Sequence, residues 1–147
     1  MHEELNAYVE HQVATASPVK LIDLLYARAV RDLAGAKELL ADTGNPRSVA
    51  DGIHLVVHAQ QIIQELNGSL NVNKGGEIAH NLHRLYEYFQ YRLTESVTKR
   101  EAAAVEEIHG LLSELHEGWH SLLLDTEGAG PDAGEMKLRA GAGILVA

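Results

Sequence analysis

The sequence predicts an all-α fold, an antiparallel up-down four-helix bundle, and three observations support this prediction. Four long segments carry apolar residues at alternating spacings of four and three positions, the pattern of a buried helix face. Short stretches of turn-forming residues separate the four segments. The chain has 147 residues, of which 46% are hydrophobic, enough for one core. Helices of similar length with short connections pack antiparallel.

The first helix is expected to start at Ser17-Pro18 and to run up to Thr43-Gly44. A serine hydroxyl can accept a free backbone N–H at a helix start, while proline has no N–H and already has a helical φ. One face of this segment is apolar and is predicted to be buried. Its residues are Ile22, Tyr26, Ala29, Leu33, Ala36 and Leu40.

The second helix is expected to start at Asn45-Pro46, which repeats the same device. Its predicted core row comprises Val49, Ile53, Val56, Ile63 and Leu70, with Gln60 as a polar member. A neighbouring apolar stripe comprises Leu55, Ala59, Ile62 and Leu66. This stripe has two explanations. A globular helix buries a face wider than a coiled-coil seam, or the stripe forms a groove that accepts an amphipathic segment of another protein.

The stretch from Asn71 to Gly76 is expected to close the second helix and open the third, and the Asn67 side chain is expected to bond to backbone at this turn. The third helix has predicted core positions Ile78, Leu82, Leu85, Phe89 and Leu93. A short join near Thr98 to Arg100 leads to the fourth helix. Its predicted core positions are Val105, Ile108, Leu112, Leu115, Trp119 and Leu122.

The chain divides into three predicted parts: an N-terminal segment at 1–16, the bundle at 17–125 and a Gly/Ala-rich flexible tail at 126–147. It has no cysteine and no apolar run near the roughly 20 residues that cross a bilayer, so a cytoplasmic protein is expected. A net charge of −9 repels phosphate backbones, so nucleic acid is not an expected partner.

Four short motifs occur in order along the chain. They are Asn6-Ala7-Tyr8, Thr15-Ala16-Ser17-Pro18, the run from Ala59-Gln60 to Glu65-Leu66-Asn67, and Lys74-Gly75-Gly76-Glu77-Ile78-Ala79. With this order and spacing, the chain resembles the flagellin-export chaperone family of the FliS type. The resemblance implies a non-enzymatic bundle that binds the C-terminal segment of flagellin in an outer apolar groove. Covering that segment would prevent premature polymerisation and keep flagellin competent for export.

The resemblance also implies which residues contact the partner. Tyr8 is expected to belong to an N-terminal lid that folds over the groove when flagellin is absent. The expected partner-binding residues are Tyr8, Leu55, Ile62, Leu66, Leu70, Ile78, Leu82 and Tyr86. No catalytic residue, cofactor or metal ligand is expected. A co-chaperone or another flagellar export component is a further candidate partner.

A metal-binding bundle of di-iron type is the alternative from a different class. Glu-x-x-His pairs occur at Glu77/His80, Glu106/His109 and Glu117/His120. The other two helices offer no carboxylate on their core rows, which such a site requires. Two histidine pairs, His54/His58 and His116/His120, have an i, i+4 spacing that can chelate Zn²⁺ or Ni²⁺, but a physiological site needs more ligands. An adaptor for another flagellar protein is the third hypothesis.

Arg28 and Asp32 depart from the family pattern, which commonly has a small residue and an aromatic or aliphatic residue at these positions. The outer side of the first helix is therefore expected to be more polar than in relatives. Any flagellin contact on that side is expected to be altered or absent.

Overall fold

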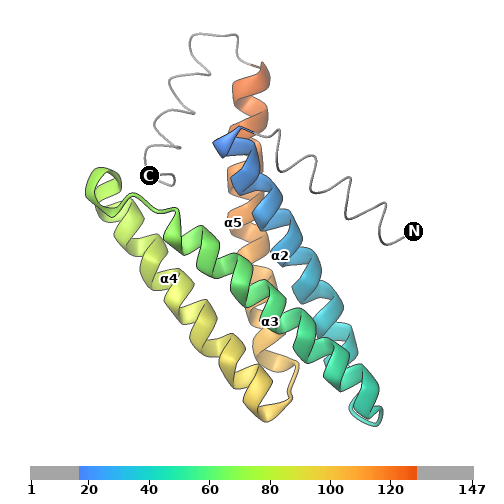
Figure 1. The fold of residues 1–147 in the computed structure, drawn as a ribbon. Coiled ribbons are helices and arrows are strands. Elements are labelled where there is room, and N and C mark those ends of the chain that lie inside the picture. The colour runs from blue at the N-terminus through green and yellow to red at the C-terminus, as the bar shows by residue number, and fades with distance from the viewer. Residues whose placement is uncertain (1–16, 129–147) are drawn as a thin grey trace.

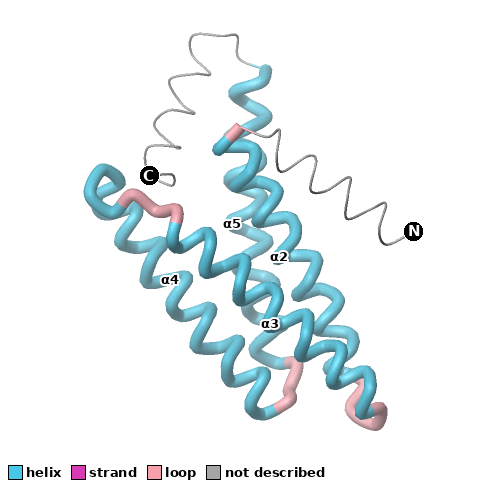
Figure 2. The backbone as a smooth tube through the Cα atoms, viewed as in Figure 1, coloured by secondary structure: helices cyan, strands magenta, loops and turns pink. Residues whose placement is uncertain are grey.

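The computed structural model describes residues 17–128, which form a bundle of four α-helices (Figure 1). They are α2 (Pro18–Ala41), α3 (Pro46–Gly68), α4 (Val72–Lys99) and α5 (Ala103–Gly128). Each helix packs against the next in the chain, and α5 packs back against α2. Successive helices run in opposite directions and are joined by short loops (Figure 2). The predicted antiparallel four-helix bundle is therefore confirmed. Residues 126–128, which were assigned to the predicted tail, belong to α5. Tyr8 and residues 129–147 lie outside the described residues.

Within residues 17–128, no helix combines the length and the apolar character needed to cross a bilayer.

Both predicted helix starts are confirmed. The Ser17 hydroxyl accepts a hydrogen bond from the backbone N–H of Lys20 at 3.3 Å, at the start of α2. At the start of α3, the Asn45 side-chain oxygen accepts from the backbone N–H groups of Arg47 at 3.1 Å and Ser48 at 3.3 Å. Each cap satisfies backbone donors that have no partner inside the helix.

The core follows the predicted rows on α2 but not everywhere else. Every residue of the predicted α2 row is buried. On α3, three residues of the neighbouring stripe are also buried, which favours the wide-face explanation for them; they are Ala59, Ile62 and Leu66. Because α3 packs against both α2 and α4, it buries a face wider than a coiled-coil seam. Ile53, placed in the core row, is only half-buried and packs at the edge of the core.

The predicted core row of α4 is wrong at its first position. Ile78 is exposed, while Ala79, on the neighbouring side of the helix, is buried. The row of α5 agrees better, since Val105, Ile108 and Leu112 are fully buried.

Two glycines allow α2 and α3 to approach closely. A methyl group added at Gly52 would lie 3.0 Å from Leu40 Cγ and 3.2 Å from Leu39 Cβ, both in the last turn of α2. At Gly35 it would lie 3.0 Å from Leu55 Cδ1, the end of a half-buried side chain. The contact at Gly52 involves atoms close to the α2 backbone, which cannot move without shifting the helix. Gly52 therefore sets the spacing between the two helices.

We expect Gly52→Ala to destabilise the protein by about 1 kcal/mol. Alanine gains about 1 kcal/mol in helix propensity, but overpacking of a core typically costs about 1 to 3 kcal/mol. Gly110→Ala is the matched control, because nothing lies within 4 Å of a methyl group at that exposed helix position. The control should stabilise by about 0.5 to 1 kcal/mol. Urea unfolding of both variants measures the difference, and equal gains in stability would show that α2 and α3 are not closely packed at Gly52.

Candidate functional site

The candidate site is an apolar surface at the N-terminal end of α4. Ile78, Leu82 and Leu85, here called the open stripe, continue the row of Phe89 and Leu93 along the same side of the helix. Phe89 and Leu93 are fully buried, whereas Leu82 and Leu85 are half-buried and Ile78 is 56% exposed. A row that faces the core along most of α4 thus becomes uncovered at one end.

The divergence of α4 from α5 explains the open stripe. The two helices meet at the loop that follows Lys99, and they separate toward the N-terminal end of α4 (Figure 1). A helix face stays buried only where a neighbouring helix covers it, so the last apolar side chains of the row are left without a full partner.

Local contacts set the position of the open stripe. Gly76 has φ 58° and ψ −134°, a left-handed conformation that favours glycine, and it kinks α4 just before Ile78. Asn67, at the end of α3, accepts a hydrogen bond from His83 Nδ1 at 2.8 Å through its side-chain oxygen. The expectation that the Asn67 side chain bonds to backbone was therefore wrong. It joins α3 to α4 beside the open stripe instead.

The structure distributes the predicted partner-binding residues over three environments. Ile78 and Leu82 belong to the open stripe, and Leu55 is half-buried on α3 and directed toward Gly35 of α2. Four others are buried in the core, namely Ile62, Leu66, Leu70 and Tyr86. Side chains packed between helices offer little area to a partner, and the role of these four in partner binding stays a prediction. Tyr8 lies outside the described residues.

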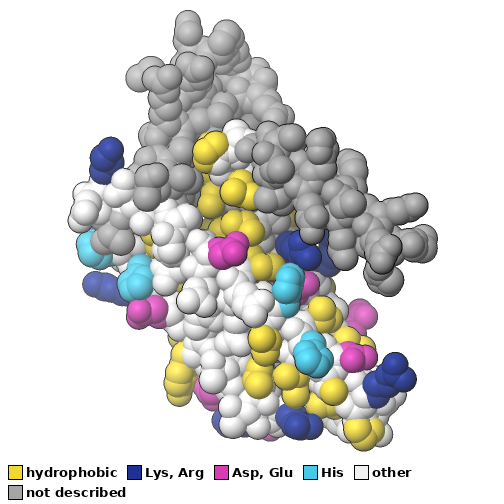
Figure 3. Space-filling view, viewed as in Figure 1, with side chains coloured by type: hydrophobic (Ala, Val, Ile, Leu, Met, Phe, Trp, Pro, Cys, Tyr) yellow, Lys and Arg dark blue, Asp and Glu magenta, His cyan; other side chains and the backbone are white. Residues whose placement is uncertain are grey.

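Periodicity could not reveal which apolar side chains reach the surface. Four large hydrophobic residues outside the predicted set are at least 39% exposed; they are Val57, Tyr88, Tyr91 and Leu124. Figure 3 shows hydrophobic side chains at the surface among histidine and charged side chains. Tyr88 donates a hydrogen bond from its hydroxyl to Glu107 Oε2 at 2.7 Å, and Arg92 Nε donates to Glu107 Oε1 at 2.8 Å. These two hydrogen bonds form a polar contact between α4 and α5. They also hold the pKa of the Glu107 carboxyl below its ordinary value, because they stabilise its charged form.

Asp32 does not simply make the outer side of α2 more polar. Its side chain is 12% exposed and hydrogen-bonds with His58 Nδ1 of α3. Arg28 is exposed, as its place on the outer side of the helix predicts. Asp32 therefore joins α2 to α3, and its charge is largely unavailable to a partner on that face.

Tyr86 is a core residue that joins α4 to α2. Its hydroxyl hydrogen-bonds with the hydroxyl of Tyr26, and both side chains are almost fully buried. Burial raises the pKa of Tyr86 and that of Tyr26, so both hydroxyls remain neutral at ordinary pH. The pair places one shared hydrogen bond inside a largely apolar core.

Known proteins resemble this chain in sequence and in fold. Residues 1–126 match the family described as flagellar protein FliS. The chain is 39% identical to the flagellar secretion chaperone FliS of Salmonella typhimurium over 114 residues, which cover 78% of this chain and 82% of the relative. It is 37% identical to the flagellar secretion chaperone FliSB of Pseudomonas aeruginosa over 114 residues, 78% of this chain and 87% of the relative. A crystal structure of a bacterial flagellar chaperone has the same fold, with a TM-score of 0.64 and 22% identity over 83% of this chain and 98% of the other.

A double-variant measurement tests the core role of Tyr86. We expect Tyr86→Phe to destabilise the protein by about 1 to 3 kcal/mol, because the buried Tyr26 hydroxyl loses its partner. Tyr26→Phe should have a similar effect. The double variant should be closer in stability to the natural chain than the sum of the two single effects, since no hydroxyl is then left unpaired. Urea unfolding of the four proteins measures the coupling, and strictly additive effects would contradict the hydrogen bond.

Proposed function

The chain belongs to the FliS family of flagellar proteins, and from this premise we propose that it binds the C-terminal segment of flagellin in the cytoplasm before export. Its role as a flagellar secretion chaperone, and not as an enzyme, follows from the family and from relatives that share more than two thirds of its length. Flagellin as the client and the cytoplasm as the compartment are the parts that we propose.

The open stripe is the observation that carries the proposal. Ile78, Leu82 and Leu85 lie in register with the buried row of α4, yet none of the four described helices fully covers them. An amphipathic segment that lays its apolar face on this row would extend the core in the way that helix-in-groove complexes do. Leu55, half-buried between α3 and α2, is a second candidate contact. The buried residues Ile62, Leu66, Leu70 and Tyr86 support this surface from within and do not contact the client directly.

The physical properties of the client fit this mode of binding. The terminal segments of flagellin are amphipathic and assemble with one another, so a chaperone that covers the apolar face of one segment blocks premature assembly. If the client segment becomes ordered only on binding, the entropy lost on ordering offsets part of the favourable binding free energy. The affinity is therefore moderate. A client held in this way can be released by competition at the export apparatus, without any chemical step.

We propose further that residues 1–16, including Tyr8, act as a lid that competes with flagellin for the apolar surface. A competing segment lowers the apparent affinity for the client and prevents exposed apolar area from promoting aggregation. Removal of residues 1–16 should therefore tighten flagellin binding, whereas weaker binding after the deletion would show that this segment helps to hold the client.

We expect Ile78→Asp to weaken binding of the flagellin C-terminal segment by at least about tenfold, because a charge would be buried against the apolar face of the client. The variant should fold normally, since Ile78 is more than half exposed. Isothermal titration of the full chain measures the affinity and the expected negative heat-capacity change. Tyr91→Asp is the matched control, because Tyr91 is 65% exposed on the same helix but outside the open stripe.

Equal losses in the two variants would place the client elsewhere on the bundle. No binding by the natural chain would contradict flagellin as the client and favour an adaptor for another flagellar protein. Leu66→Asp is unsuitable for this test, because Leu66 is 2% exposed and a charge there would unfold the core.

A further inference from the structure

We propose that Asp23, His116 and His120 bind a divalent transition-metal ion, best matched by Zn²⁺, which joins α2 to α5. These three residues are called the metal cluster below. In the part of the chain that the structure describes, they are the one group of three or more His, Cys, Asp or Glu side chains whose possible ligand atoms all lie within 4.8 Å of one another. The proposal goes beyond binding of flagellin and does not depend on it.

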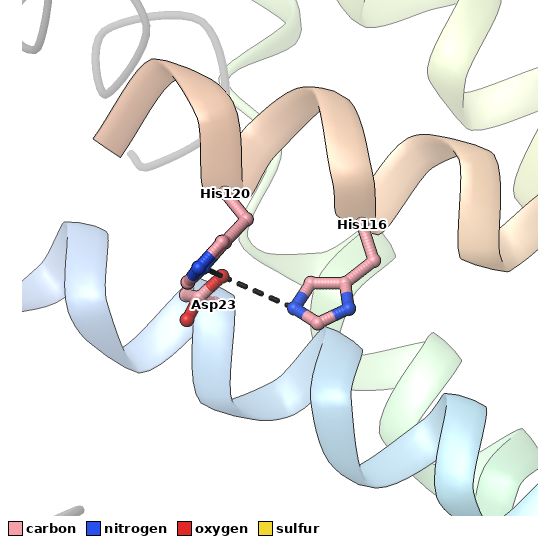
Figure 4. A group of neighbouring side chains, drawn as sticks. All are labelled: Asp23, His116 and His120. Carbon is pink, nitrogen blue, oxygen red and sulfur yellow. Dashed lines mark hydrogen bonds and ion pairs between the residues drawn. The ribbon is translucent and has the colours of Figure 1, made fainter. Parts of the chain in front are cut away.

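The metal cluster brings together side chains from the first and last described helices (Figure 4). Asp23 Oδ1 lies 3.2 Å from His116 Nε2 and 3.1 Å from His120 Nδ1. The two histidines extend from adjacent turns of α5 toward the same carboxylate of α2 (Figure 4). Their imidazole ring centroids are 5.8 Å apart.

These distances suit a shared ion. Ligand atoms about 2.0 to 2.2 Å from one Zn²⁺ ion, at tetrahedral or octahedral angles, are separated by about 3 to 3.5 Å. Both contacts of Asp23 already fall in this range. Rotation of the half-exposed His120 ring, whose side chain is 49% exposed, can close the remaining separation between the two histidines. Two imidazoles and one carboxylate form a donor set typical of zinc, with further positions open to water.

Two of the three ligands are held in place before any ion arrives. The Asp23 side chain is 14% exposed and the His116 side chain 23% exposed. The His116 ring also stacks on Tyr26, with ring centroids 6.1 Å apart and planes at 22°. One turn from these residues, Trp119 Nε1 donates a hydrogen bond to the backbone oxygen of Val19 at 3.2 Å, which fixes α5 against α2. Preorganised ligands lose less conformational entropy on binding.

The sequence did not reveal the third ligand, Asp23. His116 and His120 were recognised as a chelating pair, and the missing partner comes from α2, far away in the chain. His54 and His58 have the same spacing on α3, and His58 also contacts a carboxylate, that of Asp32. His54 is not part of a group of three in the described residues. The bundle therefore supplies an internal comparison between a complete set of ligands and an incomplete one.

Binding of the ion changes which ring nitrogen carries the hydrogen in each histidine. Without metal, the ring nitrogen of each histidine that faces Asp23 donates a hydrogen bond to the carboxylate. With metal, that nitrogen of each neutral imidazole becomes a ligand and the N–H lies on the other ring nitrogen, so no net proton is released. The ion then replaces two hydrogen bonds by three coordinate bonds between α2 and α5.

The test is a titration of the full-length, tag-free chain with ZnCl₂ after treatment with a chelator. We expect one equivalent of zinc to bind and the midpoint of thermal unfolding to rise, because the ion binds the folded state. Asp23→Asn and His120→Gln should each weaken zinc binding by at least about tenfold, since even loss of an outer-shell partner typically costs about 10- to 100-fold in affinity. Because His120 is exposed, the second variant should fold normally.

The matched control is His54→Gln, which removes a histidine at the same spacing on α3. It should leave both the stoichiometry and the thermal shift unchanged. Zinc binding that survives Asp23→Asn and His120→Gln, or that is lost in His54→Gln, would overturn the assignment. So would the absence of stoichiometric binding by the natural chain, which would leave the metal cluster as a set of hydrogen bonds only. Circular dichroism of each variant confirms that the fold is retained.

Discussion

The close packing of α2 against α3 is the constraint on which the rest of the bundle depends. Gly52 lets α3 approach the last turn of α2, and the Asp32–His58 contact joins the same two helices on their outer side. With this spacing, the whole apolar row of α2 is buried, and α3 is left with a second apolar side for α4 to cover. A wider separation would leave voids along both rows, which close-packed cores do not tolerate.

The contacts of α4 are unevenly distributed along its length. In the C-terminal half of the helix, Arg92 and Tyr88 bond to Glu107 of α5. In the same part of α4, Gln90 bonds to Gln60 of α3. Each side-chain amide donates to the backbone oxygen of the other residue, at 3.4 Å and 2.8 Å. Beside the open stripe, the described side-chain bonds from α4 to other helices are Asn67–His83 and Tyr26–Tyr86. The N-terminal part of α4 thus relies on fewer partners than the rest of the helix.

The sequence was sufficient for the fold because local signals decide it. Capping residues before proline marked the starts of α2 and α3, and the row of α2 was read correctly at every position. The candidate site was harder. Periodicity shows which side of α4 faces its neighbours, but the cover over Ile78 depends on how far α4 diverges from α5, a tertiary property. The same limit hid the burial of Leu66 and the approach of Asp23 to two histidines, because each involves residues far apart in the chain.

Two sides of the same end of the bundle therefore suit different tasks (Figure 1). The pair α2 and α5 is joined by the Trp119–Val19 bond and by Asp23 with its two histidines, contacts that hold two helices at a set distance. The N-terminal part of α4 has an apolar row without full cover and a kink at Gly76, where one residue absorbs a change of direction. If a client segment settles on the open stripe, the adjustment that it requires falls on α4, since moving α2 or α5 would break more bonds. Rigid contacts between α2 and α5 thus allow α4 to present an exposed apolar surface without loss of the fold.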